Sequence, residues 1–144
     1  HSHAQAILGC SAHSPAAAAS AAVAGADYVQ LGTMFATQTH PGKVPEGPDL
    51  ARAVAKRLAA FDRPPLLLGV GGVDATNAAR LAEAGCDGAA VIRGVSDAAD
   101  PAALARYIAT ISQGLAVQAV GGAKRDELKK IVEMVLMTWP PVAA

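Results

Sequence analysis

Residues 64–95 carry the stretch that decides the fold, PPLLLGVGGVDATNAARLAEAGCDGAAVIRGV. Leu66 to Val70 is a short apolar run without helical periodicity, which predicts a strand buried on both faces. Gly71 and Gly72 end this strand, and a glycine pair marks a place where the backbone turns sharply or comes close to another group. The first half of the stretch is therefore interpreted as a buried strand that ends in a tight turn.

The second half of the stretch predicts a helix and another strand. Asp74 and Thr76 offer side-chain oxygens that can cap a helix, and alanine and leucine follow at helical spacing. The helix is expected to end at Gly85, and Ala89–Ile92 is again short and apolar, as a strand would be. Strand, helix and strand in this order form a βαβ unit.

The residues after each of these strands indicate an anion site. A glycine pair just before a helix leaves backbone N–H groups at the positive end of the helix dipole, where phosphate binds well. The second strand is followed by Arg93, Gly94 and Ser96, which add a cation and a hydroxyl. In (β/α)8 barrels the loops after strands seven and eight often hold phosphate. The competing interpretation is that both segments are simple strand-to-helix turns.

The rest of the chain repeats the same pattern. Further strands are expected at Ala6–Gly9 and Asp27–Gly32, and the sequence AGAD at Ala24–Asp27 returns as AGCD at Ala84–Asp87, each directly before a strand. Further helices are expected over 16–24, 49–60 and 101–111. Alternating strands and helices predict an α/β fold with a parallel sheet and right-handed crossovers. Four such βα units are half of a (β/α)8 TIM barrel.

The tail after Ser112 has a different character. A glycine-bearing segment from Gln113 predicts a linker, and an amphipathic helix is expected over about Lys124–Met137. We therefore expect a half-barrel over residues 1–112, followed by a linker and helix over 113–144. The helix is expected to pack across the barrel or onto a partner subunit.

Composition excludes several classes of function. The 144 residues are short of the roughly 250 of a full barrel, and the chain opens on a polar segment, so we expect the rear portion of a longer protein. Twelve basic and twelve acidic residues with 3% aromatics argue against nucleic-acid binding. No apolar run is long enough to cross a membrane, and no signal peptide is evident. Cys10 and Cys86 are expected to be reduced, buried thiols of a cytoplasmic protein.

Three segments together resemble the superfamily of thiamine phosphate synthase and TenI-like proteins. They are ILGCSAHS from Ile7, GADYVQLGTMFATQTHPG from Gly25, and LLLGVGGVDATNAARLAEAGCDGAAVIRGV from Leu66. Their order and spacing match the second half of the family's (β/α)8 barrel over about Ala6 to Ile111. The resemblance implies a transferase of thiamine biosynthesis, which joins a hydroxymethylpyrimidine diphosphate to a thiazole phosphate and releases pyrophosphate with magnesium present.

The resemblance also implies roles for individual residues. The serine after the fifth strand, Ser11, would contact the pyrimidine diphosphate. The T-x-T motif and the glycine pair would hold the thiazole phosphate, and the loop after the last strand would complete its pocket; these residues are Thr37, Gln38, Thr39, Gly71, Gly72, Ile92 and Arg93. Hydroxyl donors and cations suit a departing pyrophosphate, where negative charge accumulates.

The sequence departs from the family pattern at two residues. His40 stands where the family usually has a lysine after T-x-T, and imidazole can donate to a diphosphate but is only partly charged at neutral pH. Arg93 stands where the synthases usually have a serine, and its planar guanidinium can bind phosphate through two N–H groups. The family's pyrimidine-binding and magnesium-binding residues belong to the first half of the barrel, so this chain alone is expected not to catalyse the whole reaction.

Two alternatives remain from the sequence. TenI-like thiazole tautomerases place a histidine after strand five as general acid–base, and His13 matches it. The second alternative is a non-catalytic half-barrel that binds small-molecule phosphates. A half-barrel leaves open sheet edges and apolar strand faces, so a homo-oligomer or a missing N-terminal half is expected to cover them.

Overall fold

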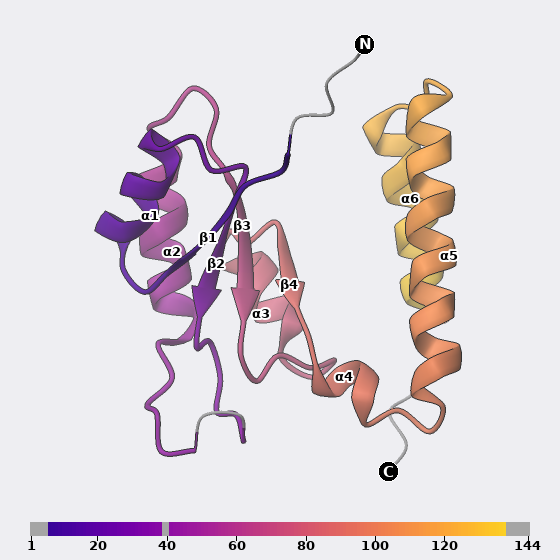
Figure 1. Cartoon of the computed structure of the whole chain (residues 1–144), viewed down its shortest axis with the longest axis horizontal. Coiled ribbons are helices and arrows are strands. Elements are labelled where there is room, and N and C mark those ends of the chain that lie inside the picture. Colours follow the sequence, from indigo (N-terminus) through magenta and orange to yellow (C-terminus); the bar gives the residue numbers. More distant parts are fainter. Residues whose placement is uncertain (1–5, 39–40, 138–144) are drawn as a thin grey trace. The chain divides into compact units, whose positions relative to one another are not determined.

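The computed structural model describes residues 6–38 and 41–137, and the chain divides into two compact units between Ile92 and Arg93 (Figure 1). The predicted division between 112 and 113 falls inside a helix of the second unit. Within the described residues, no helix combines the length and the apolar content needed to span a bilayer. Each unit is described by itself.

The first unit alternates strands and helices, as the sequence predicts. In chain order they are β1 (Gly9–Ala12), α1 (Pro15–Val23), β2 (Tyr28–Gly32), α2 (Gly47–Leu58), β3 (Leu66–Val70), α3 (Ala78–Glu83) and β4 (Gly88–Ala90). The strands form one parallel sheet in the order β1-β2-β3-β4. The α/β class, the parallel sheet and the βα repeat are confirmed.

Strand boundaries shift in three places, and β2 begins at Tyr28 rather than at Asp27. β1 begins at Gly9 rather than at Ala6, so Ser11 lies within the strand, and β4 ends at Ala90. The prediction that both cysteines are buried is wrong. Cys10 is exposed because β1 is an edge strand of the described sheet, and Cys86 is half-buried just before β4. Burial, and then the charge of Asp87, raises the pKa of the Cys86 thiol.

The core lies between one face of the sheet and the helices. Val29, Leu31 and Leu67 point from the strands into a cluster with the buried faces of α1, α2 and α3. Figure 1 shows α1 and α2 side by side, and the two helices are in contact. Alternate strand residues face the other side, and there Leu66 is 55% exposed. The prediction that this strand is buried on both faces is therefore wrong, because the helices cover only one.

Local sequence explains where α1 begins. The hydroxyl of Ser14 accepts a hydrogen bond from the Ala17 N–H at 3.2 Å, and Pro15 occupies the first helical position. Most of the helix is alanine, with little difference in polarity between its faces. Ala18, Ala19 and Ala21 are buried. Small side chains let this helix lie close to β1 and α2.

The AGAD and AGCD repeats build two equivalent helix-to-strand corners. Gly25 and Gly85 have φ of 82° and 88°, a left-handed conformation that favours glycine at a helix end. Asp27 then donates its N–H to the Leu8 carbonyl at 2.8 Å and accepts the Leu8 N–H at 2.7 Å. Each corner therefore stops a helix and ties the next strand to the preceding one.

The second corner repeats these contacts on β3. Asp87 donates its N–H to the Leu67 carbonyl at 2.8 Å, and its carboxylate accepts the Leu67 N–H at 2.8 Å. Both aspartates lie at the amino ends of their strands, away from the loops that carry the predicted site. Their role in the structure is to join neighbouring strands.

The second unit contains α4 (Arg93–Ser96), α5 (Pro101–Val120) and α6 (Arg125–Met137). α5 contacts both of the other helices, and its N-cap Asp100 accepts the Ala103 N–H at 2.9 Å. The predicted linker from Gln113 is wrong up to Val120. Gln, Leu and Ala continue a helix readily, and the single Gly114 costs only about 1 kcal/mol relative to alanine. The amphipathic helix is confirmed as α6.

Candidate functional site

The candidate site lies at the carboxyl ends of β1, β2 and β3, within the first unit. The segment after β2 packs directly on the turn after β3. Met34 donates its N–H to the Val70 carbonyl at 2.9 Å, and Phe35 donates to the Gly71 carbonyl at 3.0 Å. Two loops that the sequence predicts to bind phosphate are therefore joined through their backbones.

Gly71 and Gly72 have the conformation and the surroundings that only glycine satisfies. Their φ values are 93° and 64°. A Cβ on Gly71 would lie 2.7 Å from Cγ2 of Thr33, and one on Gly72 would lie 2.3 Å from the Ala36 carbonyl oxygen. The sequence predicts a sharp turn or a close approach, and both occur.

The segment between the glycine pair and α3 differs from the prediction. The helix begins at Ala78, so the glycine pair does not stand directly before it, and Asp74 and Thr76 are not its N-cap. Instead the Asp74 carboxylate accepts the Thr76 N–H at 2.8 Å and its hydroxyl at 2.6 Å. Side chains of this segment thus accept hydrogen bonds from backbone N–H groups of the same segment. The physical reason is that Asp and Asn compete for backbone hydrogen bonds outside helices.

Asp74 and Asn77 set the local charge of this segment. Hydrogen bonds from the side chain and then the backbone of Thr76 lower the pKa of the Asp74 carboxyl. Asn77 donates Nδ2–H to the Gly72 carbonyl at 2.9 Å and accepts the Asp74 N–H at 3.0 Å. The segment therefore carries one negative charge, and it is fastened to the glycine turn by an amide.

His13 joins the loop after β1 to the end of β2. Its Nδ1 is hydrogen bonded to the Gly32 carbonyl oxygen. A carbonyl only accepts hydrogen bonds, so Nδ1 carries the proton and the neutral ring has its lone pair on Nε2. Ser11 lies in β1 opposite Gln30 of β2 and is exposed.

The remaining predicted residues are only partly described. Thr37 is half-buried and Gln38 is exposed in the segment after β2, whereas Thr39 and His40 lie outside the described residues. Ile92, the last residue of the first unit, is 67% exposed.

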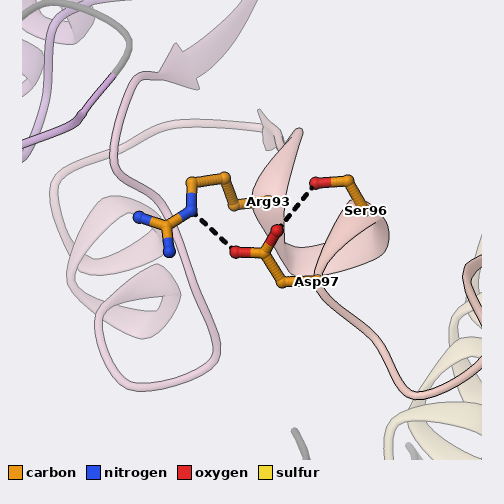
Figure 2. A network of polar contacts seen from close by, with 3 residues as sticks. All are labelled: Arg93, Ser96 and Asp97. Atoms are coloured by element: carbon orange, nitrogen blue, oxygen red, sulfur yellow. Dashed lines mark hydrogen bonds and ion pairs between the residues drawn. The ribbon is translucent and has the colours of Figure 1, made fainter.

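Arg93 opens α4 in the second unit and is held by its own helical turn. Its Nε donates to Oδ2 of Asp97 at 2.7 Å, and Ser96 Oγ donates to Oδ1 of the same carboxylate at 3.1 Å; Figure 2 shows how the three side chains lie. These hydrogen bonds, from Arg93 first and then Ser96, lower the pKa of the Asp97 carboxyl. The pair is exposed, so it contributes little to stability.

Sequence reasoning missed three residues that shape the site. Asn77 is fastened to the glycine turn, Arg80 on α3 lies 5.3 Å from the Phe35 ring centroid, and Thr33 is a buried polar residue at the end of β2. The spacing of an amide a few residues after a glycine pair could have indicated the first. Nothing in the sequence pairs Arg80 with Phe35, because the contact depends on how the two loops pack.

Comparison with known proteins agrees with this arrangement. Residues 1–95 match the family model described as thiamine monophosphate synthase. The chain belongs to the thiamine monophosphate synthase family. The thiamine-phosphate synthase of Bacillus velezensis is 39% identical over 101 residues, which are 69% of this chain and 43% of that protein. The enzyme of Natronomonas pharaonis is 40% identical over 114 residues, 77% of this chain and 51% of that protein.

A solved structure leads to the same assignment. Thiamine phosphate pyrophosphorylase from Pyrococcus furiosus superposes with a TM-score of 0.55 at 30% identity, over 90% of this chain and 50% of that one. The chain thus spans about half the length of the thiamine monophosphate synthase relatives it matches. Its four parallel βα strands are a partial barrel of the (β/α)8 family.

The site places a glycine turn and an imidazole at the carboxyl ends of neighbouring strands. A glycine turn can present backbone N–H groups to an anion, and the Nε2 lone pair of His13 can accept a proton. Among the described residues, no three His, Cys, Asp or Glu side chains lie together.

Proposed function

We propose that this chain supplies the part of a thiamine-phosphate synthase that anchors the thiazole phosphate. One observation carries the proposal: the segment that leads to Thr37 is hydrogen bonded to the Gly71–Gly72 turn, through Phe35 N–H and the Gly71 carbonyl at 3.0 Å. Two segments with phosphate-binding sequence thus meet at one edge of the sheet. Membership of the family supplies the reaction class.

In the proposed reaction, the thiazole nitrogen forms a C–N bond to the methylene carbon of the hydroxymethylpyrimidine diphosphate, and the C–O bond to pyrophosphate breaks. The turn at Gly71–Gly72 and the hydroxyls of Thr37 and Thr39 bind the thiazole phosphate and orient the nucleophile. Ser11 and His40 donate to the departing diphosphate, whose negative charge grows as the bond breaks.

From the family resemblance alone, Arg93 is proposed to bind phosphate. Its Nε is engaged by Asp97, which orients the guanidinium and leaves its two terminal nitrogens for an anion. Replacing Arg93 by serine, the residue usual in the family, is expected to weaken thiazole phosphate binding but not to abolish it. The backbone at Ile92 is proposed to complete the pocket.

Calorimetric titration of the full chain tests the phosphate anchor. Thiazole phosphate is expected to bind at least tenfold more tightly than thiazole alcohol, and Gly71→Val is expected to weaken the phosphate complex at least tenfold. Gly25→Ala is the matched control: it replaces another left-handed glycine, at the opposite ends of the strands and with open space around it. Equal affinity for the two compounds would overturn the proposal.

A thiazole tautomerase is the second candidate, and the hydrogen bond of His13 favours it. Because the Gly32 carbonyl accepts the hydrogen bond from Nδ1–H, Nε2 is the nitrogen that carries the lone pair a proton shuttle needs. His13→Asn retains an N–H donor for the carbonyl but removes the base. If tautomerisation is the activity, this variant loses it while thiazole phosphate still binds. An assay of pyrophosphate release with both substrates identifies the synthase instead.

A further inference from the structure

Asn77 lies at the junction of the glycine turn and α3, and both polar groups of its side chain are used. Nδ2 donates to the Gly72 carbonyl at 2.9 Å, while Oδ1 accepts the Asp74 N–H at 3.0 Å. The Gly72 carbonyl requires a donor and the Asp74 N–H requires an acceptor, so the two contacts together identify the nitrogen and the oxygen of the amide. The side chain is thus held at both ends, and it links the turn to the segment that leads into the helix.

The hydrogen bond to Gly72 fixes a peptide plane. The Gly72–Val73 bond is trans, since the only cis peptide in the described residues is Gly32–Thr33. In a trans peptide the N–H points opposite to the carbonyl. With the Gly72 carbonyl held by Asn77, the Val73 N–H is directed away from Asn77.

The preceding peptide plane is fixed in the same way. Phe35 donates its N–H to the Gly71 carbonyl at 3.0 Å, so the Gly72 N–H is directed away from Phe35. Among the described residues, none accepts a hydrogen bond from the N–H of Gly72 or of Val73. Two consecutive donors are therefore oriented by their carbonyls and have no acceptor in the described part of the chain.

We propose that Asn77 is a positioning residue for phosphate recognition: it holds the Gly72 carbonyl and so aims the Val73 N–H at the bound phosphate. This inference rests on the proposed function. Asn77 itself touches no phosphate and acts through the turn. The Asp74 carboxylate accepts the backbone N–H of Thr76 at 2.8 Å, a contact that does not depend on the Thr76 side chain.

The amide is required because the two contacts need one acceptor and one donor. A carboxylate at the same place could still accept the Asp74 N–H, but it would face the Gly72 carbonyl without a proton to donate. Asn77→Asp therefore removes one contact and preserves the shape of the side chain. Asn77→Ala removes both contacts and adds no charge. Thr76→Val is the matched control, because it removes the hydroxyl contact to Asp74 and leaves the Gly72 contact in place.

The experiment titrates the full-length variants with thiazole phosphate and thiazole alcohol, with melting temperatures measured in parallel. Asn77→Asp and Asn77→Ala are expected to weaken thiazole phosphate binding about tenfold and to leave alcohol binding within twofold. Thr76→Val is expected to lower the melting temperature without changing the ratio of the two affinities. A merely structural role would lower the melting temperature of all three variants and leave that ratio unchanged.

The outcomes separate the two proposals. A wild-type chain that does not prefer the phosphate compound overturns the proposed function. A wild-type chain that prefers it, with both Asn77 variants retaining that preference, overturns only the role of Asn77. If circular dichroism shows that Asn77→Asp does not fold, Asn77→Ala decides the question, since it places no uncompensated charge beside the Gly72 carbonyl.

Discussion

At the scale of single residues, space distinguishes glycines that share the same backbone conformation. Gly25 and Gly72 both have positive φ, at 82° and 64°. A Cβ on Gly25 would meet nothing within 4 Å, whereas a Cβ on Gly72 would overlap the carbonyls of Phe35 and Ala36. The left-handed conformation alone strains an alanine, and the overlap adds a clash with backbone that has little room to move.

Gly72→Ala is therefore expected to destabilise the chain more than Gly25→Ala. The strain common to both variants costs about 1 kcal/mol, and the clash raises the cost at Gly72 to about 3 kcal/mol or more. Urea unfolding of the two variants measures the difference. Equal losses of unfolding free energy would show that the loop after β2 moves to accommodate the added methyl group.

Asp74 predicts a pH dependence. Its pKa is lowered by hydrogen bonds from Thr76, so the ionised form is favoured in the folded chain. The resulting stability is present above the unfolded pKa of about 3.9, and it is lost as the pH falls through the lower folded pKa. Asp74→Ala should cost less than about 1 kcal/mol at pH 7, because the carboxylate is exposed.

Urea unfolding at pH 7 and near pH 3 measures that contribution. The difference between wild type and Asp74→Ala is expected to shrink at the lower pH. Asp62→Ala, at an exposed aspartate after α2, is the control for general charge effects. A difference that grows on acidification would contradict the assignment.

At the scale of elements, the two AGxD corners make the same contacts in different surroundings. Asp87 accepts the N–H of Leu67, whose side chain is buried, whereas Asp27 accepts that of Leu8, which is exposed. Water can replace a lost acceptor only at the exposed corner. Removing a partner from a buried donor costs about 1–3 kcal/mol, and the cost is smaller where water has access.

Asp87→Ala is accordingly expected to destabilise the chain more than Asp27→Ala. The equivalent backbone contacts at the two corners make each variant the control for the other. Urea unfolding free energies give the comparison. If Asp27→Ala cost as much as Asp87→Ala, solvent access would not be what distinguishes the corners.

One substitution in helix α5 is expected to stabilise the chain, whereas the substitutions above destabilise it. Gly114 lies in its interior, and a Cβ there would meet nothing within 4 Å. Gly114→Ala should therefore stabilise the helix by about 0.5–1 kcal/mol. Gly122→Ala, which also has open space but a φ of 93°, should instead destabilise it. Thermal melts measure whether the melting temperature rises for Gly114→Ala and falls for Gly122→Ala.

The sequence predicts elements well where the signal is local. Ser14 and Pro15 define the start of α1, and the glycines of the repeats end α1 and α3. The sequence does not predict features that depend on contacts with other segments or on competition between alternative hydrogen bonds. The burial of Leu66 depends on what covers the second face of the sheet, and the Asp74–Thr76 contact competes with helix capping in a way that spacing does not reveal.

At the scale of the whole molecule, the described strands leave apolar surface exposed. β1 pairs only with β2, and β4 only with β3, within the described residues. Leu66 lies on the sheet face that the helices do not cover, while its neighbour in sequence, Leu67, is buried. Open sheet edges and apolar faces favour association.

We expect the chain to sediment above its monomer mass. Leu66→Lys should shift it toward the monomer by charging the exposed sheet face. Val23→Lys is the matched control, because Val23 is an exposed apolar residue on α1. Sedimentation velocity over a range of concentrations measures the effect, and a wild-type chain that stays monomeric throughout would contradict the prediction.

The glycine turn is the part of the site that the sequence predicts best. Glycine is the residue that a sharp turn or a close approach requires, so the residue type itself indicates the turn. Of its supports, Asn77 could have been indicated by its spacing from the glycine pair, whereas the contact of Arg80 with Phe35 forms only once the sheet and α3 are in place. Family membership supports the proposed reaction class, but the contacts that orient the turn come from the packing of separate segments.

The packing of Gly72 against the carbonyls of Phe35 and Ala36 has a kinetic consequence. A turn held on both sides has no slow rearrangement to complete when a ligand arrives. The association rate of the proposed phosphate ligand should then be limited by diffusion and should depend on ionic strength. That rate should be inversely proportional to solvent viscosity.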